Sequence, residues 1–413
     1  MRTVVPLKKQ IEIIDNTLAA RIPAIIPGIM AEYGFDMWII LCREYNEDPI
    51  YPTMVPYLCL TARRLSCLVF TLEKGVFHAY HFGRPDSKIA RLYEQAYTDI
   101  TRDQLQELAD FIQRKDPRKI GVNLSKLSGM SDGLSHQLYE DLCACLAPGY
   151  AERLASAYEL STHWIETRLP EELSRYYSVY ALAMDICLEA YSRKVIIPGV
   201  TTTTEVEEWI AQEINRLGLT FWFSPHVDVQ RKGIHKTGST GLVIQQGDLL
   251  HYDVGIKYFG LCTDSQRMGY VLRDGEREVP EYLRTAFAKT CRFQDIVAEE
   301  HIAGRTGNDI LRRCLDRAKA EGIQAALYNH PIGFFGHSAG TIVGLWDMQD
   351  GIGPMGDFPL HYNTCYALEL NTESELAEWD GQRVRFSAEE SVAFTQDGKL
   401  SYLFPGRETI IAI

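Results

Sequence analysis

The stretch HYDVGIKYFGLCTDSQR, residues 251–267, places two aspartates, Asp253 and Asp264, among apolar residues. Its two strand-like runs flank a Tyr-Phe-Gly segment, which predicts a β-hairpin. Pairing Asp253 with Asp264 would put the turn at Tyr258–Phe259 and both aspartates on one face, with Cβ atoms about 5 Å apart. Two carboxylates that close repel each other unless a divalent cation lies between them. The alternative is that each aspartate caps a turn or pairs with an arginine such as Arg267.

Other potential metal ligands follow in the same half of the chain. A glutamate in the middle of an apolar strand is rarely buried without a partner. Oxygen and nitrogen donors without a thiolate favour Mn, Fe(II), Co or Zn over a cysteine-rich structural zinc site. The candidates are His330 and His337 in NHPIGFFGHSAG, Glu369 within the strand-like CYALELN, and Glu389 and Glu390 at the predicted start of the strand FSAEESVAFT.

Composition excludes several classes of protein. The 413 residues are too many for one ordinary core, so two domains are expected, and 46% hydrophobic with 23% charged residues is typical of a soluble globular protein. The net charge of −13 argues against a nucleic-acid or anionic-membrane surface. We find no unbroken apolar run of about 18–20 residues and no signal peptide, so no membrane partner is expected. Ten cysteines without a CxxC motif suit a reducing compartment, and a cytoplasmic location is expected.

Patterning divides the chain into an α/β domain, residues 1–165, and an α+β domain, residues 166–413. The first domain alternates helix-like and strand-like segments, whereas the second combines amphipathic helices with antiparallel strands. Its helices are predicted at 170–195, 202–218, 281–302 and 308–321, and its strands at 249–256, 261–272, 364–371 and 389–396.

The potential ligands, taken in order, resemble those of a known family. Asp253, Asp264, His330 with a second histidine seven residues later, Glu369 and Glu389 look like the ligand set of the pita-bread metallopeptidases. These include aminopeptidase P, prolidase and methionine aminopeptidase, with creatinase as a metal-free relative. The resemblance covers about residues 170–413. It implies an α+β pita-bread (creatinase/aminopeptidase) catalytic domain, preceded by an α/β creatinase-like N-terminal domain.

The resemblance also implies roles for these residues. Asp253 would ligate one ion, His330 and Glu369 the other, and Asp264 and Glu389 would bridge the two. The cofactor would be two divalent metal ions, with Mn expected first and Co, Fe or Zn as alternatives. A hydroxide shared by the ions would then be the nucleophile.

Two histidines match the substrate-side positions of the family. His235, in KGIHKTG, and His337 are expected to hold the scissile carbonyl and its oxyanion and to shuttle a proton. His251 shares the strand face of Asp253, so it is expected in the core or beside the ligands. His226 is expected either to pack in a loop or to contact substrate.

Several positions depart from the family pattern. Pro331 replaces a glycine after His330, Gln266 stands where threonine is common, and Ser387 stands where prolidase-like members often carry arginine. Arg385 is near that position but out of register. These residues neighbour the ligands and influence ligand orientation. Glu390 is the alternative to Glu389 as the ligand.

The resulting functional hypothesis is a dinuclear metallo-exopeptidase that cleaves Xaa-Pro bonds, of aminopeptidase or dipeptidase type, with a peptide substrate and a homodimer or larger homo-oligomer as the assembly. A metal-free creatinase-like C–N hydrolase and a non-catalytic binding protein on the same fold are the alternatives. GHSAG, residues 336–340, matches a serine-hydrolase motif, but no helical pattern follows it. An apolar slot for the proline ring is expected among Phe221, Trp222, Phe223, Phe334, Phe335 and Trp346.

Overall fold

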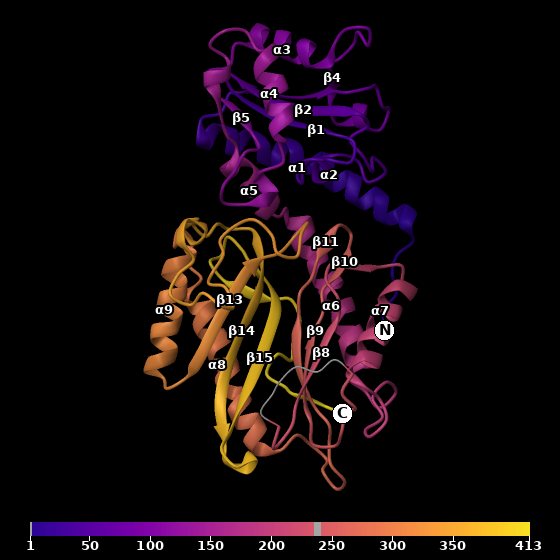
Figure 1. Cartoon of the computed structure of the whole chain (residues 1–413), viewed down its shortest axis with the longest axis vertical. Coiled ribbons are helices and arrows are strands. Elements are labelled where there is room, and N and C mark those ends of the chain that lie inside the picture. Colours follow the sequence, from indigo (N-terminus) through magenta and orange to yellow (C-terminus); the bar gives the residue numbers. More distant parts are fainter. Residues whose placement is uncertain (1, 235–240) are drawn as a thin grey trace. The chain divides into compact units, whose positions relative to one another are not determined.

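The computed structural model describes residues 2–234 and 241–413, which form two compact units (Figure 1). The N-terminal unit is Pro6–Thr167, and the C-terminal unit is Arg168–Ile413 together with the short segment before Pro6. Within the C-terminal unit, the backbone N–H of Val5 donates to the hydroxyl of Tyr258 (2.9 Å). The boundary expected from the sequence lies two residues earlier in the chain than this division.

The N-terminal unit is built on a six-stranded sheet in the order β4-β3-β2-β1-β5-β6. Its strands are β1 (Met37–Arg43), β2 (Leu65–Glu73), β3 (Val76–Phe82), β4 (Glu94–Gln95), β5 (Ile120–Val122) and β6 (Leu154–Ser156). Its helices are α1 (Leu7–Tyr33), α2 (Tyr51–Met54), α3 (Gln104–Lys115), α4 (His136–Cys145) and α5 (Tyr158–Glu166). Strands and helices alternate along the chain, as the α/β prediction requires.

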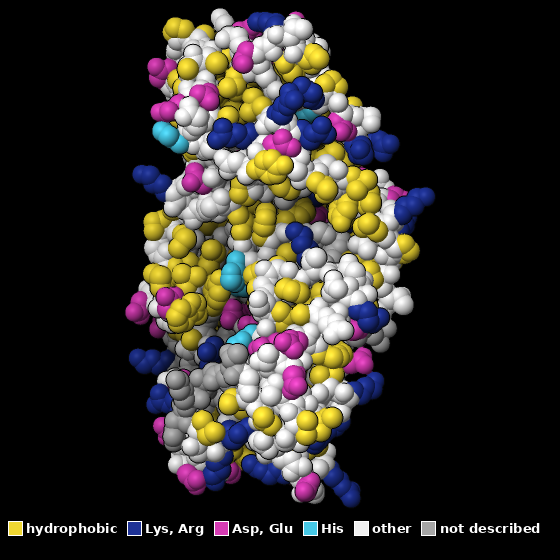
Figure 2. Space-filling model, turned by 45° about the vertical axis from the view of Figure 1, so that its right-hand side comes forward, with side chains coloured by type: hydrophobic (Ala, Val, Ile, Leu, Met, Phe, Trp, Pro, Cys, Tyr) yellow, Lys and Arg dark blue, Asp and Glu magenta, His cyan; other side chains and the backbone are white. Residues whose placement is uncertain are grey.

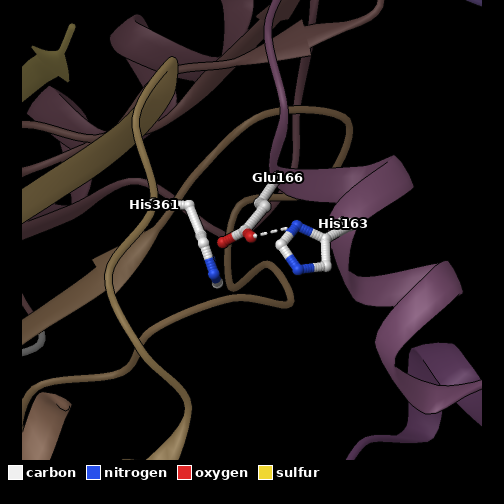
Figure 3. A group of neighbouring side chains, drawn as sticks. All are labelled: His163, Glu166 and His361. Atoms are coloured by element: carbon white, nitrogen blue, oxygen red, sulfur yellow. Dashed lines mark ion pairs between the residues drawn. The ribbon is translucent and has the colours of Figure 1, made fainter. Parts of the chain in front are cut away.

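Helix α1 is long and apolar enough to cross a membrane by length and composition alone, a property that the search for an unbroken apolar run missed. In this unit it packs as a core helix, with Leu18, Ile22 and Ile26 buried. Its last residue, Tyr33, contacts α5 through a hydrogen bond between its hydroxyl and His163 Nε2 (2.8 Å). On α5, Nδ1 of the same histidine lies 3.1 Å from a carboxylate oxygen of Glu166 (Figure 3).

The C-terminal unit combines two helix pairs with a large, mainly antiparallel sheet (Figure 1). The helices are α6 (Pro170–Ala190), α7 (Thr203–Arg216), α8 (Glu281–Glu300) and α9 (Gly307–Ala320). The main path of the sheet is β13-β14-β15-β12-β9-β8, with β16 beside β15 and β17 beside β12. The bounds are β8 (His226–Gln230), β9 (Leu249–Asp253), β12 (Gln266–Tyr270), β13 (Gln324–Pro331), β14 (Thr364–Leu376), β15 (Gln382–Phe394), β16 (Leu400–Tyr402) and β17 (Ile411–Ala412). A small second sheet has the order β11 (Leu261–Cys262), β10 (Ile256–Tyr258), β7 (Thr220–Phe221).

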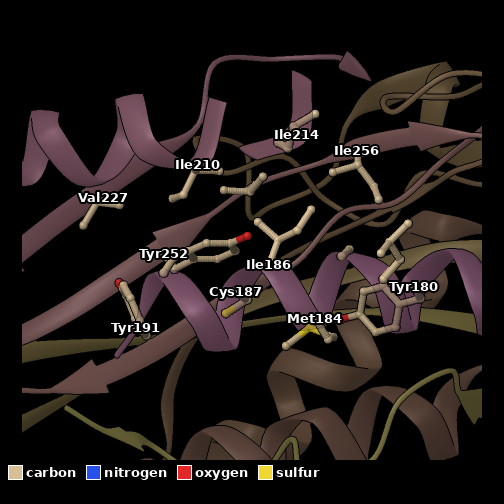
Figure 4. Close-up of a cluster of buried hydrophobic side chains, with 14 of the residues drawn as sticks. Tyr180, Met184, Ile186, Cys187, Tyr191, Ile210, Ile214, Val227, Tyr252 and Ile256 are labelled. Carbon is tan, nitrogen blue, oxygen red and sulfur yellow. The ribbon is translucent and has the colours of Figure 1, made fainter. Parts of the chain in front are cut away.

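All four predicted helices of this unit are present, and local sequence accounts for where two of them begin. Helix α6 begins with Pro170, which lacks the N–H that a first helical turn leaves unpaired. Helix α7 begins after Thr202, which exchanges hydrogen bonds with Glu205 in a capping box. The two helices cover β8 and β9 with a buried cluster that includes Ile186, Ile210, Val227 and Tyr252 (Figure 4).

Strands β14 and β15 form a long hairpin, and both strands are longer than the sequence predicted. β14 runs to Leu376, and β15 begins at Gln382 rather than at Glu389, which therefore lies inside the strand. Even-numbered apolar residues, among them Leu368, Leu370, Phe386 and Ala388, face the core shared with α8 and α9. Because side chains alternate along a strand, Glu369 and Glu389 lie on the opposite face, away from those helices.

The hairpin at residues 251–267 exists, but the predicted register is wrong by two residues. Asp253 pairs with Gln266 rather than with Asp264. The turn falls at Phe259 and Gly260, whose φ angles of 54° and 76° suit the tight turn that joins two twisted strands. An even shift leaves every side chain on its original face, so Asp253 and Asp264 still share one face of the sheet.

Candidate metal centre

One row of paired residues crosses the sheet and carries most of the predicted ligands. Paired residues lie side by side on one face, with Cβ atoms about 5 Å apart. The row runs across six strands through Tyr328 (β13), Glu369 (β14), Glu389 (β15), Gln266 (β12), Asp253 (β9) and His226 (β8). The site is therefore a product of strand register, assembled from segments more than 150 residues apart in sequence.

Asp264 joins this row from the short segment between β11 and β12. Hydrogen bonds from Val254 N–H to Ser265 O (3.2 Å) and from Thr263 N–H to Ile256 O (2.9 Å) continue the hairpin on either side of it. The hydroxyl of Ser391 accepts from the Asp264 N–H (3.2 Å) and donates to its carbonyl (3.0 Å), which ties this segment to β15. The Asp264 side chain is consequently buried beside Glu389.

His330 reaches the same place from the end of β13, two residues beyond Tyr328 and therefore on its face. Its Nδ1 lies 3.2 Å from the carbonyl oxygen of Pro331, which can only accept a hydrogen bond, so Nδ1 carries the proton. The unprotonated Nε2 lies 3.6 Å from a carboxylate oxygen of Asp264 and 3.6 Å from one of Glu389. Three hydrogen-bond acceptors thus face one another.

These acceptors have the chemistry of a cation site. His330 Nε2 and both carboxylate oxygens of Glu389 are buried, with no hydrogen-bond donor near them in the described part of the chain. Burying such groups unpaired is costly, and a divalent cation would satisfy all of them at once. The residues present therefore fit a metal.

Ligand atoms fall into overlapping groups in which all atoms lie within 4.8 Å of one another. One group contains Asp253, Asp264 and Glu389, and another contains His330, Glu369 and Glu389. Glu389 belongs to both groups. Asp264 also lies within that distance of His330, in a third group that contains His337.

The electrostatics of the site show how strongly its acids need compensation. Burial raises the pKa of Asp253, and burial with neighbouring carboxylates raises the pKa of Asp264 and Glu389 well above the usual range. Burial and the charge of Asp253 raise the pKa of Glu369 to about 7. Burial lowers the pKa of His330 to about 3, so its imidazole is neutral and able to ligate a metal. Without a cation, protons would have to neutralise several of these groups at neutral pH.

The two histidines predicted on the substrate side have different outcomes. His337 lies beside the site, with its ring centroid 4.7 Å from that of His330 and 5.0 Å from that of Trp222, which it meets edge-on. Partial burial lowers the pKa of His337, so it too is neutral at pH 7. His235 lies outside the described residues, and its role stays a prediction.

A pocket of about 500 Å³ opens over the carboxylates. Of the six aromatic residues proposed for an apolar slot, Trp222, Phe223 and Trp346 line it. Figure 2 shows one face of the C-terminal unit, on which histidine and acidic side chains lie close together. The pocket thus offers an aromatic wall beside a polar floor.

Several pocket residues were not predicted as site residues from the sequence, Tyr328 and Arg385 among them. The alternation of side chains along a strand could have identified both. Tyr328 precedes His330 by two residues and Arg385 precedes Glu389 by four, so each lies on the same strand face as a predicted ligand.

The positions that depart from the family pattern have definite contacts. Gln266 donates through Nε2 to Glu369 Oε1 (2.9 Å), and its Oε1 lies 2.8 Å from His251 Nε2. His251 therefore lies beside the ligands, which was one of the two places predicted for it. His226 is on β8 rather than in a loop, with Nε2 3.1 Å from Asp228. Ser387 is buried two residues before Glu389 on its face.

Glu390 and Ser338, the two alternatives considered for the chemistry, have other surroundings. Glu390 lies on the helix-facing side of β15, where Arg267 donates to both its carboxylate oxygens, one of them at 2.7 Å, and the Tyr180 hydroxyl donates at 3.0 Å. Ser338 is followed by bends and turns rather than by the helix that a nucleophile elbow requires. Neither side chain shares the ligand row.

Solved structures of known proteins share this fold across nearly the whole chain. An X-Pro aminopeptidase from Thermotoga maritima is 14% identical, with 92% of this chain and 98% of that chain covered and a TM-score of 0.65. An Xaa-Pro dipeptidase from Bacillus anthracis is 16% identical, with 97% and 100% covered and a TM-score of 0.65. The N-terminal domain of the FACT complex subunit SPT16 from chickpea, Cicer arietinum, is 11% identical, with 96% and 99% covered and a TM-score of 0.59. At these identities the likeness shows the fold, which also occurs in a protein whose name is not that of a peptidase.

A comparison with curated proteins found no match. The model of metallopeptidase family M24, however, matches residues 179–392, just over half of the chain. This range contains every predicted metal ligand, and members of the family use divalent metals. The predicted pita-bread fold is confirmed, and the chain belongs to metallopeptidase family M24.

Proposed function

We propose that this chain is a dinuclear metal-dependent exopeptidase that hydrolyses an Xaa-Pro bond, at the N-terminus of peptides or in dipeptides. The observation that carries the proposal is a set of buried acceptors that face one another, His330 Nε2, Asp264 and Glu389. Among the described residues, His330 Nε2 and both carboxylate oxygens of Glu389 have no hydrogen-bond donor. A merely structural sheet has no reason to bury such a set. The two overlapping ligand groups support two ions rather than one.

The ligands divide between the two ions according to these groups. Asp253 would hold one ion, and His330 with Glu369 would hold the other. Asp264 and Glu389 would be shared between both. Bound divalent ions would supply Lewis acidity and lower the pKa of water at the site. Donors that are all oxygen or imidazole nitrogen make Mn²⁺ our first choice, with Co²⁺, Fe²⁺ and Zn²⁺ as alternatives.

Two side chains of the pocket would act on the scissile carbonyl. His337 is neutral and can donate one hydrogen bond to the carbonyl oxygen as negative charge develops there. Burial and three nearby carboxylates raise the pKa of Tyr328, so its hydroxyl stays protonated and is a second donor toward the pocket. His235 remains our proposal for the other substrate-side histidine.

The preference for proline is supported by the shape of the pocket. A proline nitrogen in a peptide bond carries no hydrogen, so an enzyme recognises an Xaa-Pro bond by shape rather than by a hydrogen bond to that nitrogen. Trp222, Phe223 and Trp346 provide flat apolar surfaces on the pocket wall. We place this enzyme in the cytoplasm, supported by ten unpaired cysteines, and expect a homodimer or larger homo-oligomer.

The proposal is tested with metal-depleted protein that is then loaded with Mn²⁺. Elemental analysis should find about two ions per chain, and peptides that differ only at the second residue should be cleaved faster with proline than with alanine. Protein that holds two ions but prefers alanine would keep the metallopeptidase and refute the Xaa-Pro specificity. Protein that binds no ion and still hydrolyses a small C–N bond would favour the creatinase-like alternative.

A further inference from the structure

The floor of the site continues into a hydrogen-bonded array that the ligand set does not use. Gln266, 3% exposed, lies between Glu369 and His251. Beyond it, His251 Nδ1 lies 3.3 Å from a carboxylate oxygen of Asp228, and His226 Nε2 lies 3.1 Å from the same carboxylate. The array therefore runs from a predicted metal ligand across β12 and β9 to β8.

The direction of the hydrogen bonds in this array is fixed by its first member. The Glu369 carboxylate is held by the side-chain Nε2–H of Gln266, so the carbonyl oxygen of the same amide must face His251. His251 Nε2 is then the donor to that oxygen. With Asp228 against the other ring nitrogen, the imidazole cannot rotate without losing a contact.

Strand register explains why these side chains meet. Gln266 pairs with Asp253 on one side and with Glu389 on the other, so it sits in the middle of the ligand row. His251 lies two residues before Asp253 on β9, and therefore on the same face, and it pairs with Asp228 on β8. A glutamine is long enough to reach both Glu369 and His251, whereas a threonine hydroxyl is one group at the end of a short side chain. The contact between Gln266 and His251 thus depends on the length and the amide group of the glutamine side chain.

We infer that Gln266 is a positioning residue for Glu369, and that His251 and Asp228 hold Gln266 in the required orientation. The amide hydrogen bond holds one carboxylate oxygen of Glu369 and leaves the other oxygen available for the ion that Glu369 and His330 would hold. This inference rests on the metal-binding part of the proposed function. Hydrogen-bond partners of metal ligands typically account for a factor of about 10–100 in metal affinity.

The test measures Mn²⁺ binding to the metal-depleted full-length protein by isothermal titration calorimetry. Gln266→Met keeps the length of the side chain and removes both hydrogen bonds. It should lower the affinity for one Mn²⁺ ion about 10–100-fold and leave the affinity for the other ion unchanged. His251→Leu should weaken the binding of the same ion. The double variant should lose little more affinity than either single variant, because both substitutions interrupt the same series of hydrogen bonds. The visible spectrum of the Co²⁺-loaded protein should change in Gln266→Met, which reports directly on the geometry of the ligands.

A matched control is Gln230→Met. Gln230 is a buried glutamine on β8 that bonds the backbone of Arg385, with its Nε2 2.7 Å from the carbonyl and its Oε1 2.9 Å from the N–H. Its loss should lower the melting temperature and leave both Mn²⁺ affinities unchanged. Wild-type protein that binds two ions while Gln266→Met retains both affinities, or loses both equally, overturns this inference alone. Wild-type protein that binds no ion overturns the proposed function and this inference together.

Discussion

Two neighbouring glutamates on β15 should respond in opposite ways to the same substitution. Glu389 and Glu390 are 1% and 0% exposed and lie on opposite faces of the strand. Glu389 faces Asp264 and His330 with neither carboxylate oxygen bonded to a described donor. Glu390 instead accepts two hydrogen bonds from Arg267 and one from Tyr180. Replacing either by glutamine preserves its size and removes its charge.

The change Glu390→Gln should destabilise the fold. It leaves the buried guanidinium of Arg267 without a counter-charge, and removing one partner of a buried ion pair costs about 3–5 kcal/mol. For a domain of this size, each kcal/mol lowers the melting temperature by about 2–4 °C, so a fall of roughly 6–20 °C is expected. Both metal ions should still bind to the fraction of protein that is folded, because Glu390 lies outside the ligand row.

The change Glu389→Gln should act on metal binding rather than on folding. Burial and the charges of Asp264 and Glu369 raise the pKa of Glu389 well above its usual range, so without metal the folded state favours a neutral side chain here. The metal-depleted variant should therefore melt no lower than wild type at pH 8. It should also lose Mn²⁺ binding and turnover, since an amide offers one oxygen where a shared ligand needs two.

Differential scanning calorimetry of the metal-depleted proteins at pH 8, with calorimetric Mn²⁺ titration of each, separates the two effects. Wild type is the reference for both measurements. The reasoning is refuted if Glu390→Gln loses metal without a loss of stability, or if Glu389→Gln binds two ions with wild-type affinity. Either outcome would mean that the ligand face of β15 has been misassigned.

Three further outcomes are expected. His337→Ala should retain both ions by elemental analysis while kcat falls by a factor of about 10²–10³, the usual loss when one oxyanion donor is removed; loss of an ion would instead make His337 a ligand. The metal-depleted protein should lose stability as pH rises from about 4.5 to 7, because the folded state holds a proton on Glu369 up to about pH 7 and the unfolded chain does not. Each pKa unit is worth about 1.4 kcal/mol, so the loss is about 3 kcal/mol, and chemical denaturation across this range should show a smaller loss in Glu369→Gln. Trp346 is 76% exposed on the pocket wall, so its fluorescence should be quenched when a peptide that is not hydrolysed binds. The change Trp346→Ala should raise KM more than it lowers kcat, and an unchanged KM would show that Trp346 does not contact the substrate.

The types of the candidate ligands, their order and the strand faces that they share could all be predicted from local sequence patterns. Alternating side chains place Asp253 and Asp264 on one face for any even register, so their proximity survived a register error of two residues. The capping box at Thr202 and Glu205 and the proline at the start of α6 likewise depend on neighbours in sequence, and local patterns identified them.

Strand register, and the contacts that depend on it, could not be predicted in this way and became known from the folded chain. The pairing of Gln266 with both Asp253 and Glu389 depends on the turn at Phe259–Gly260 and on the packing of three strands, none of which a local pattern encodes. The same holds for the separation of Glu389 from Glu390, since the partner that distinguishes them, Arg267, lies 123 residues away from Glu390. Side-chain periodicity is a property of one strand and can be predicted from sequence, whereas register is a property of two strands and is set by the whole core that presses them together.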